Sequence, residues 1–188
     1  ALSKQDVATA GGKGANLGEL TRAGAPVPPG FVVTARAYLS AMEAGGVRDE
    51  LRTVASSVDV EDDAALRDGA RRLQELVTKA GVPAALRDEV LRAYARFPAG
   101  TRVAVRSSAT AEDTAETSFA GMNKTFTNVR DAEELLARIV ECWASLYGER
   151  VVAYRATQGV RDEPAIAVVV QQMDDSERSG VMFTADPA

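Results

Sequence analysis

Residues 102–129 read RVAVRSSATAEDTAETSFAGMNKTFTNV, and this stretch decides both the fold and the site. It opens with the alternation of a short strand, in which Val103 and Val105 share one face, and then turns polar. Hydroxyl side chains crowd around two cations, Arg106 and Lys124, and Gly121 supplies a backbone that a ligand can approach closely. The hydroxyls include those of Ser107, Ser108, Thr110, Ser118 and Thr125. This composition is typical of a site that binds phosphate.

The overall composition indicates a globular domain that meets an anionic ligand locally. The chain has 188 residues and is 46% hydrophobic, which is enough for the core of one large or two small domains. Its net charge is −5 and only 5% of its residues are aromatic, which argues against nucleic acid as the main partner. The chain contains no histidine, which excludes histidine acid–base chemistry, phosphohistidine formation on this chain and most transition-metal sites.

Targeting signals are missing from these residues. No run reaches the length of a membrane span, and the first residues lack the basic and then apolar pattern of a signal peptide. A cytoplasmic location and no membrane partner are therefore expected. The single cysteine, Cys142, fits that location, because it lies in an apolar-periodic segment where a buried structural thiol is expected rather than a nucleophile.

A glycine-rich turn near the start of the chain is a second candidate for phosphate binding. Residues 7–24 read VATAGGKGANLGELTRAG, which predicts a short helix that begins near Lys13 and has Gly24 as its C-cap. A Walker A loop is excluded, because Val7 and Gly14 stand where that loop needs a glycine and a Ser or Thr. The free N–H groups and dipole of a helix start still favour an anion. A surface turn with a solvated lysine explains the same residues equally well.

The remaining pattern predicts alternating strands and helices. Strands are expected over 31–34, 165–172 and 179–184, the last two as an antiparallel hairpin. Residue Thr34 is expected to cap a helix over 35–44, and Asp131 a helix that continues through 147. Residues 47–100 form a helical insert with helices near 64–80 and 83–97, and a further helix is expected over 149–157.

The predicted elements also indicate where two pairs of side chains lie. Trp143 and Tyr147 share a helical face and are expected to pack inward. The strand over 165–172 is almost continuously apolar, which indicates a central strand buried on both faces. Its polar end, Gln171 and Gln172, is therefore expected at the rim of the sheet, where ligands bind.

Six blocks of sequence, taken in order, resemble one known domain. The resemblance is to the ATP-binding domain shared by phosphoenolpyruvate synthase, pyruvate phosphate dikinase and rifampin phosphotransferase, and it covers nearly all of the chain except the insert. The blocks are GGKGANLGEL, VPPGFVVT, AVRSSATAED, SFAG, CWASLYGERVVAYR and SGVMFTADP. The resemblance implies an α/β (α+β) fold: the first lobe of an ATP-grasp-like domain, with a mixed or antiparallel sheet, flanking helices and the insert at about 47–100.

The resemblance also implies an activity that these residues cannot complete. In the family, the β-phosphoryl group of ATP passes to a histidine on a swivelling domain, giving AMP, phosphate and phosphohistidine. That domain then phosphorylates pyruvate or rifampin. The chain has no histidine. The second ATP-grasp lobe, with the ligands of Mg²⁺, and the histidine-bearing domain are therefore expected outside these 188 residues, and the isolated chain is expected to bind ATP weakly and produce no AMP.

The resemblance carries ATP contacts to six positions: Lys13, Arg106, Gly121, Thr125, Gln171 and Gln172. Lys13 and Arg106 correspond to cations on the ATP phosphates, where they would neutralise charge that shifts during transfer. Gly121 and Thr125 match the loop that closes over the nucleotide. The two glutamines match the strand end that meets adenine.

Other readings of the same residues remain open. Arg106 could form an ion pair with Glu112 or Asp113, and the hydroxyl of Thr125 could simply face solvent. After Gly121 the chain has Met122-Asn123 where synthase-like members carry glutamine, which leaves the loop contacts and the family branch undecided. A non-catalytic nucleotide-sensing or interaction module, and an α/β domain whose polar loop is only structural, are the alternative functions.

Overall fold

The computed structural model describes residues 2–110, 124–160, 162–178 and 180. Over these residues the chain forms short strands separated by helices, as the sequence predicts. The elements in chain order are η1 (Lys4–Asp6), α1 (Val7–Arg22), β1 (Gly30–Val33), α2 (Ala35–Ala44), α3 (Arg48–Ser57), α4 (Asp63–Ala80), α5 (Ala84–Tyr94), β2 (Val103–Ala109), β3 (Thr125–Val129), α6 (Ala132–Ala144), η2 (Ser145–Tyr147), α7 (Glu149–Thr157) and β4 (Ile166–Gln172).

The described strands form one antiparallel sheet in the order β1-β4-β2-β3. The apolar β4 lies between β1 and β2, and its residues 166–171 are all buried. The prediction of a central strand is therefore confirmed, and the physical reason is that both faces of β4 are covered. The second strand expected over 179–184 lies outside the described residues, apart from Gly180.

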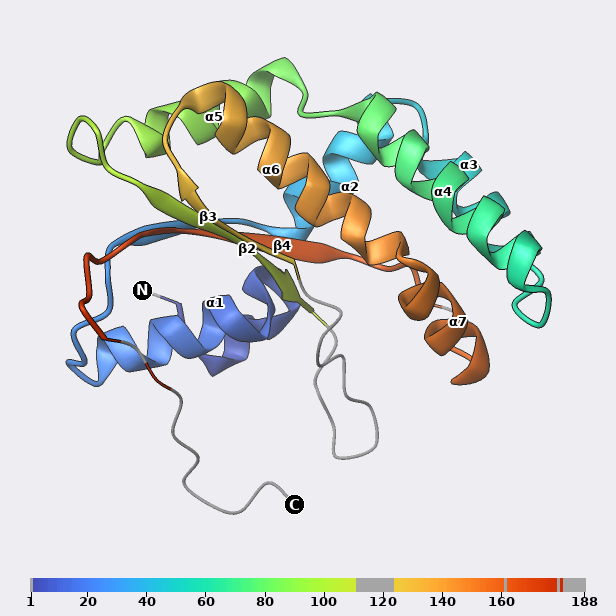
Figure 1. The fold of residues 1–188 in the computed structure, drawn as a ribbon, viewed down its shortest axis with the longest axis horizontal. Helices are drawn as coiled ribbons and strands as arrows, with labels where there is room; N and C mark the ends of the chain where they lie inside the picture. Colours follow the sequence, from blue (N-terminus) through green and yellow to red (C-terminus); the bar gives the residue numbers. More distant parts are fainter. Residues whose placement is uncertain (1, 111–123, 161, 179, 181–188) are drawn as a thin grey trace, which may run out of the picture.

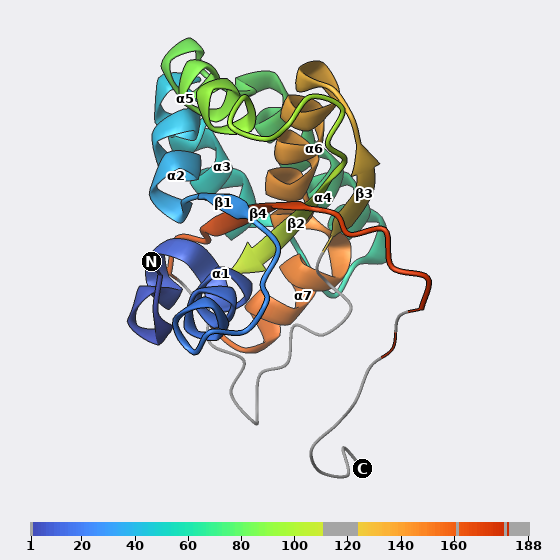
Figure 2. The same cartoon turned by 90° about the vertical axis from the view of Figure 1, so that its left-hand side faces the viewer.

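The sheet separates the molecule into two unequal layers. Figure 1 shows the sheet nearly edge-on, with α1 against one face and α2, α5 and α6 on the opposite side, and Figure 2 shows the same division from the end. Small residues let α1 approach the sheet closely: a Cβ on Gly14 would lie 3.4 Å from the Val32 side chain. The buried residues of α1 are glycines and alanines, whereas Leu20 is 50% exposed.

The main core fills the opposite layer. Trp143 is fully buried on α6, and its ring meets that of Tyr38 on α2 edge-on, with 5.8 Å between the centroids. The hydroxyls of Tyr38 and Tyr147 are 3.1 Å apart and share a hydrogen bond. The inward packing expected for Trp143 and Tyr147 is confirmed, and the buried pair of phenols keeps its polar atoms satisfied.

Helix starts agree with the capping signals of the sequence. The side chain of Thr34 accepts a hydrogen bond from the Ala37 N–H, and that of Asp131 accepts one from the Glu134 N–H. The predicted helices of the insert are present as α4 and α5. Helix α3 was not predicted, although its buried Leu51 and Val54 have helical spacing. No helix in the described residues is long and apolar enough to cross a membrane.

The thiol of Cys142 lies fully buried on α6. Burial, helped by the nearby Glu141 charge, raises its pKa from 9.0 to about 12, although the charges of Lys13 and Lys124 and a hydrogen bond with the Ser107 backbone act in the opposite direction. An inert structural thiol is the expected consequence, because the thiolate is the reactive form.

Stability is therefore expected to fall as the pH rises above about 9. The thiol of the unfolded chain ionises near its ordinary pKa of 9.0, whereas the folded thiol stays protonated until about 12. Between these values the folded state binds more protons, so Cys142 contributes a loss of up to about 1.4 kcal/mol of unfolding free energy per pH unit. Urea unfolding from pH 8 to pH 10.5 measures it. A Cys142→Ala variant should show a smaller slope, and equal slopes would contradict the assignment.

Candidate functional site

The polar part of the opening stretch continues the strand. The sequence predicts a strand that turns polar after Arg106, but β2 runs on through Ala109. Residues Ser107 and Ser108 pair with Val168 and Ala167 of β4. Both serines are fully buried, and strand structure is possible there because their hydroxyls are hydrogen-bonded to backbone groups.

The strand register brings predicted site residues together on the α1 face of the sheet. Arg106 pairs with Thr125 of β3 on one side and with Val169 of β4 on the other. Direct partners point to the same face of an antiparallel sheet, so Arg106 and Thr125 lie side by side. Gln171 pairs with Ala104, two residues before Arg106, and therefore shares this face.

Arg106 and Gln171 are in direct contact. The Nη1 of Arg106 donates a hydrogen bond of 3.3 Å to the Oε1 of Gln171, and the Nε2 of Gln171 donates one of 3.3 Å to the Pro28 carbonyl. The amide of Gln171 is thus oriented from both ends, with its oxygen toward the guanidinium. Gln171 is only 8% exposed. The first predicted glutamine therefore steadies the cation, in addition to any contact with a ligand.

The second predicted glutamine lies on the other face. Gln172 pairs with Val103, whose side chain belongs to the main core. Because side chains alternate along a strand, Gln172 points away from the face that carries Arg106. The backbone N–H of Gln172 donates to the Pro29 carbonyl. Gln171 and Gln172 were predicted together at the ligand-binding rim of the sheet, but their side chains point to opposite faces.

A break in α1 places Lys13 beside β2. Gly11 has φ +69° and ψ 168°, so the helix is interrupted there and begins again before Lys13. The hydroxyl of Ser108 fills this break. Its Oγ accepts hydrogen bonds of 3.1 Å from the Lys13 N–H and 3.3 Å from the Gly14 N–H, and it donates one of 2.9 Å to the Ala10 carbonyl.

This contact corrects the expectation of free N–H groups near Lys13. A helix start is anion-binding when its N–H groups lack partners, but two of them here already donate to Ser108. These two N–H groups are therefore not available to an anion. Sequence reasoning missed the role of Ser108, since its partners lie 94 to 98 residues away in the chain. The adjacent Gly11 and Gly12 within a helical pattern are the feature of the sequence that could have predicted the break in the helix.

The other polar residues of the stretch also make distant contacts. The Oγ of Ser107 donates to the Lys124 carbonyl at 3.2 Å and accepts from the Lys124 N–H at 2.8 Å. The Oγ1 of Thr110 donates to the Ala165 carbonyl at 2.9 Å. Serine and threonine hydroxyls often bond to nearby backbone groups in the chain. Here they instead hold Thr110 and Lys124, which flank residues 111–123, against the sheet.

Part of the predicted site lies outside the described residues. This applies to Gly121, Ser118, Met122-Asn123 and the carboxylates of Glu112 and Asp113 that were considered as partners of Arg106. Within the described ranges no carboxylate forms an ion pair with Arg106. The side chain of Arg106 is partly exposed beside the exposed Thr125. This pair of residues offers a cation and a hydroxyl to an anionic ligand.

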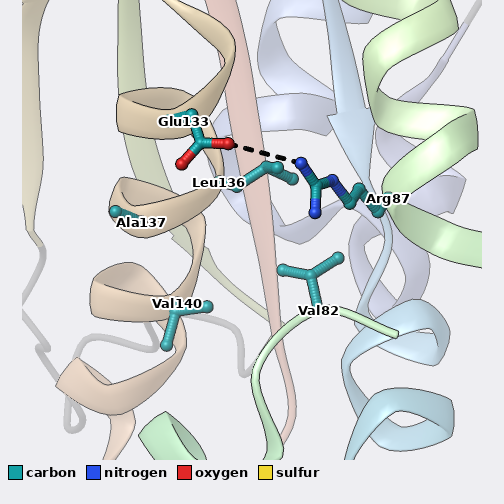
Figure 3. A pocket seen from close by; sticks show the side chains of 6 residues that line it. All are labelled: Val82, Arg87, Glu133, Leu136, Ala137 and Val140. Carbon is teal, nitrogen blue, oxygen red and sulfur yellow. Dashed lines mark hydrogen bonds and ion pairs between the residues drawn. The ribbon is translucent and has the colours of Figure 1, made fainter. Parts of the chain in front are cut away.

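A shallow cavity of about 260 Å³ lies in the other layer, between α5 and α6. Figure 3 shows Val82, Leu136 and Val140 around it, with the ion pair of Arg87 and Glu133 at its edge. The Arg87 cation is neutralised by its partner, and none of the predicted site residues lines this cavity. The α1 face of the sheet is therefore the better candidate for a phosphate site.

The described residues contain no cluster of metal-binding side chains. No group of three or more Asp, Glu, His or Cys side chains converges within the described ranges to hold an ion. Magnesium requires several oxygen ligands in near-octahedral geometry. No chemical step is therefore assigned to Mg²⁺ at these residues.

These features define an α/β lobe in which the described residues place a guanidinium, an amide and a hydroxyl on the sheet face beside α1. Over residues 7–188 the chain matches the family described as the pyruvate phosphate dikinase AMP/ATP-binding domain. The chain belongs to this family.

Several related proteins also match nearly the whole chain. The chain is 44% identical over 193 residues to the probable phosphoenolpyruvate synthase of Methanothermobacter thermautotrophicus, covering 100% of the chain and 28% of that protein. It is 43% identical over 192 residues to the probable phosphoenolpyruvate synthase of Methanocaldococcus jannaschii, covering 99% and 16%. It is 45% identical over 183 residues to a rifampicin phosphotransferase of a Streptomyces species, covering 96% and 21%. The chain thus spans 16% to 28% of the length of these relatives.

Proposed function

We propose that this chain binds ATP on the α1 face of its sheet and acts as the ATP-binding lobe of a phosphotransferase that works through a phosphohistidine. The observation that supports the proposal is the row of Thr125, Arg106 and Gln171 on that face. Lys13 lies on α1, and its backbone N–H is hydrogen-bonded to β2, the strand that carries Arg106. A guanidinium and an ammonium can together neutralise phosphoryl oxygens, which is the main task of a protein in phosphoryl transfer.

The full reaction needs groups that this chain does not contain. In the proposed reaction, ATP, water and a histidine give AMP, inorganic phosphate and phosphohistidine. The chain has no histidine, so the acceptor belongs to a swivelling domain elsewhere in the protein or in a partner. Mg²⁺ would accompany ATP, and the described residues contain no cluster of three or more candidate ligands for it. The final acceptor is pyruvate or rifampin; identities of 44% and 45% to the two kinds of relative favour neither.

Mapping the amide resonances of the chain during titration with Mg·ATP tests the location of the site. Changes are expected at Lys13, Arg106, Thr125 and Gln171, because the bound phosphates and base would alter their surroundings. The resonances of α4, in the opposite layer, should not change. A titration with Mg²⁺ alone should leave the resonances of the proposed site unchanged. Changes confined to α4, α5 and α6, or no changes at millimolar Mg·ATP, would contradict the proposal.

A further inference from the structure

The proposed site draws its two phosphate cations from different elements. Arg106 stands on β2 and Lys13 on α1, and the segments that join them in sequence run through α2, α3, α4 and α5. Two cations neutralise one polyphosphate effectively only when their separation is fixed. A direct bridge between α1 and β2 would supply that constraint.

Ser108 forms such a bridge. It lies on β2 two residues after Arg106, so the two side chains share one face of the sheet at a separation of about 7 Å along the strand. Its hydroxyl accepts from the backbone N–H of Lys13 at 3.1 Å. The same strand therefore carries one cation and holds the backbone of the other.

The bridge is tightly built. The Ser108 side chain is fully buried, and its three hydrogen bonds use the donor and both acceptor positions of the hydroxyl. Gly11 makes room for it, since a Cβ there would lie 2.3 Å from both the carbonyl oxygen and the Oγ of Ser108. Ser108 thus acts as an N-cap that β2 provides to α1.

We propose that Ser108 is a positioning residue of the ATP site, whose hydroxyl fixes Lys13 relative to Arg106. The inference rests on the proposed function, because it assumes that both cations bind ATP phosphates. Ser108 itself has no hydrogen-bonding capacity left for a ligand. Its effect on ATP must therefore pass through the position of Lys13.

A double-mutant cycle with Mg·ATP as the probe separates this role from simple support of the fold. Calorimetric dissociation constants are compared for the wild-type chain, Ser108→Ala, Lys13→Ala and the double variant, each at a temperature where circular dichroism shows it folded. Ser108→Ala is expected to weaken ATP binding about tenfold in the wild-type background. In the Lys13→Ala background the same change should cost less than about twofold, because the group that it positions is gone.

Ser145 supplies the matched control. It is a buried serine on the other side of the sheet, whose hydroxyl donates to the Cys142 carbonyl at 2.7 Å. Ser145→Ala should lower stability and leave the dissociation constant for Mg·ATP unchanged. Ser108→Cys keeps the shape of the side chain, with a sulfur that is larger than the hydroxyl oxygen and a weaker acceptor, and replaces Ser108→Ala if that variant does not fold; its expected loss is about threefold.

The outcomes distinguish the two proposals. If the wild-type chain does not bind Mg·ATP, the proposed function fails and the inference fails with it. If the wild type binds, but Ser108→Ala binds equally well or loses the same factor in both backgrounds, only the positioning role is overturned. The positioning role is supported if the double-mutant cycle is non-additive and amide exchange at Lys13 and Gly14 is faster in Ser108→Ala.

Discussion

Replacing Gly11 with alanine is expected to lower the free energy of unfolding by about 3 kcal/mol or more. At φ +69° and ψ 168°, Gly11 occupies a region that residues with a Cβ rarely adopt. The added Cβ would also lie 2.3 Å from two oxygen atoms of Ser108, one of them in the backbone of β2. Either α1 must leave the sheet or the Ser108 bridge must break. Urea unfolding at neutral pH measures the loss.

The adjacent Gly12 offers a matched control in the same helix. Its φ is not positive, and a Cβ there would meet nothing within 4 Å. Gly12→Ala should therefore be neutral or stabilising by up to about 1 kcal/mol, because alanine has the higher helix propensity. Similar losses in the two variants would show that the break at Gly11 is not the constraint described above.

Replacing Arg106 with alanine is expected to weaken Mg·ATP binding by about 10- to 100-fold. The guanidinium is the fixed cation of the proposed site, because β2 holds its backbone and Gln171 orients its side chain. Arg106→Lys should recover only part of the affinity, since an ammonium cannot reproduce a bidentate contact with phosphate oxygens. Calorimetric titration of each variant measures the change.

Arg92 is the control for the loss of charge. It is an exposed arginine on α5, in the layer on the opposite side of the sheet, and Arg92→Ala removes the same charge from the chain. Its effect on Mg·ATP binding should stay within about twofold, because screening weakens charges beyond about 10 Å. Unchanged affinity in Arg106→Ala, or equal losses in the two variants, would exclude Arg106 from the site.

Local signals predicted most elements of the fold. Thr34 and Asp131 cap their helices as expected, because an N-cap hydrogen bond joins residues three positions apart. The apolar run of β4 predicted a central strand, since only a strand covered on both faces can be apolar throughout. Helix α3 escaped detection, because its only buried residues are Leu51 and Val54.

The sequence predicted which residues belong to the candidate site. The pairing of the strands in the sheet decides which of their side chains lie next to one another. Arg106 and Thr125 come from different parts of the opening stretch, and the pairing of β2 with β3 makes them neighbours. Gln171 and Gln172 could not be told apart in the sequence, because a strand sends adjacent side chains to opposite faces and the face toward α1 depends on the whole sheet. The pairing of β4 with β2 assigns Gln171 to the side of Arg106.

The sequence by itself determined the family, the N-caps of α2 and α6, and the cations available for phosphate. Each of these depends on residue chemistry or on contacts within a few positions of the chain. Only the tertiary structure decided that Ser108 caps a helix from a distant strand, that Gly11 breaks α1 to receive it, and that Lys13 and Arg106 are thereby linked. The physical reason is that a hydrogen bond between residues more than 90 positions apart depends on how α1 packs against the sheet, and no local pattern in the chain encodes that packing.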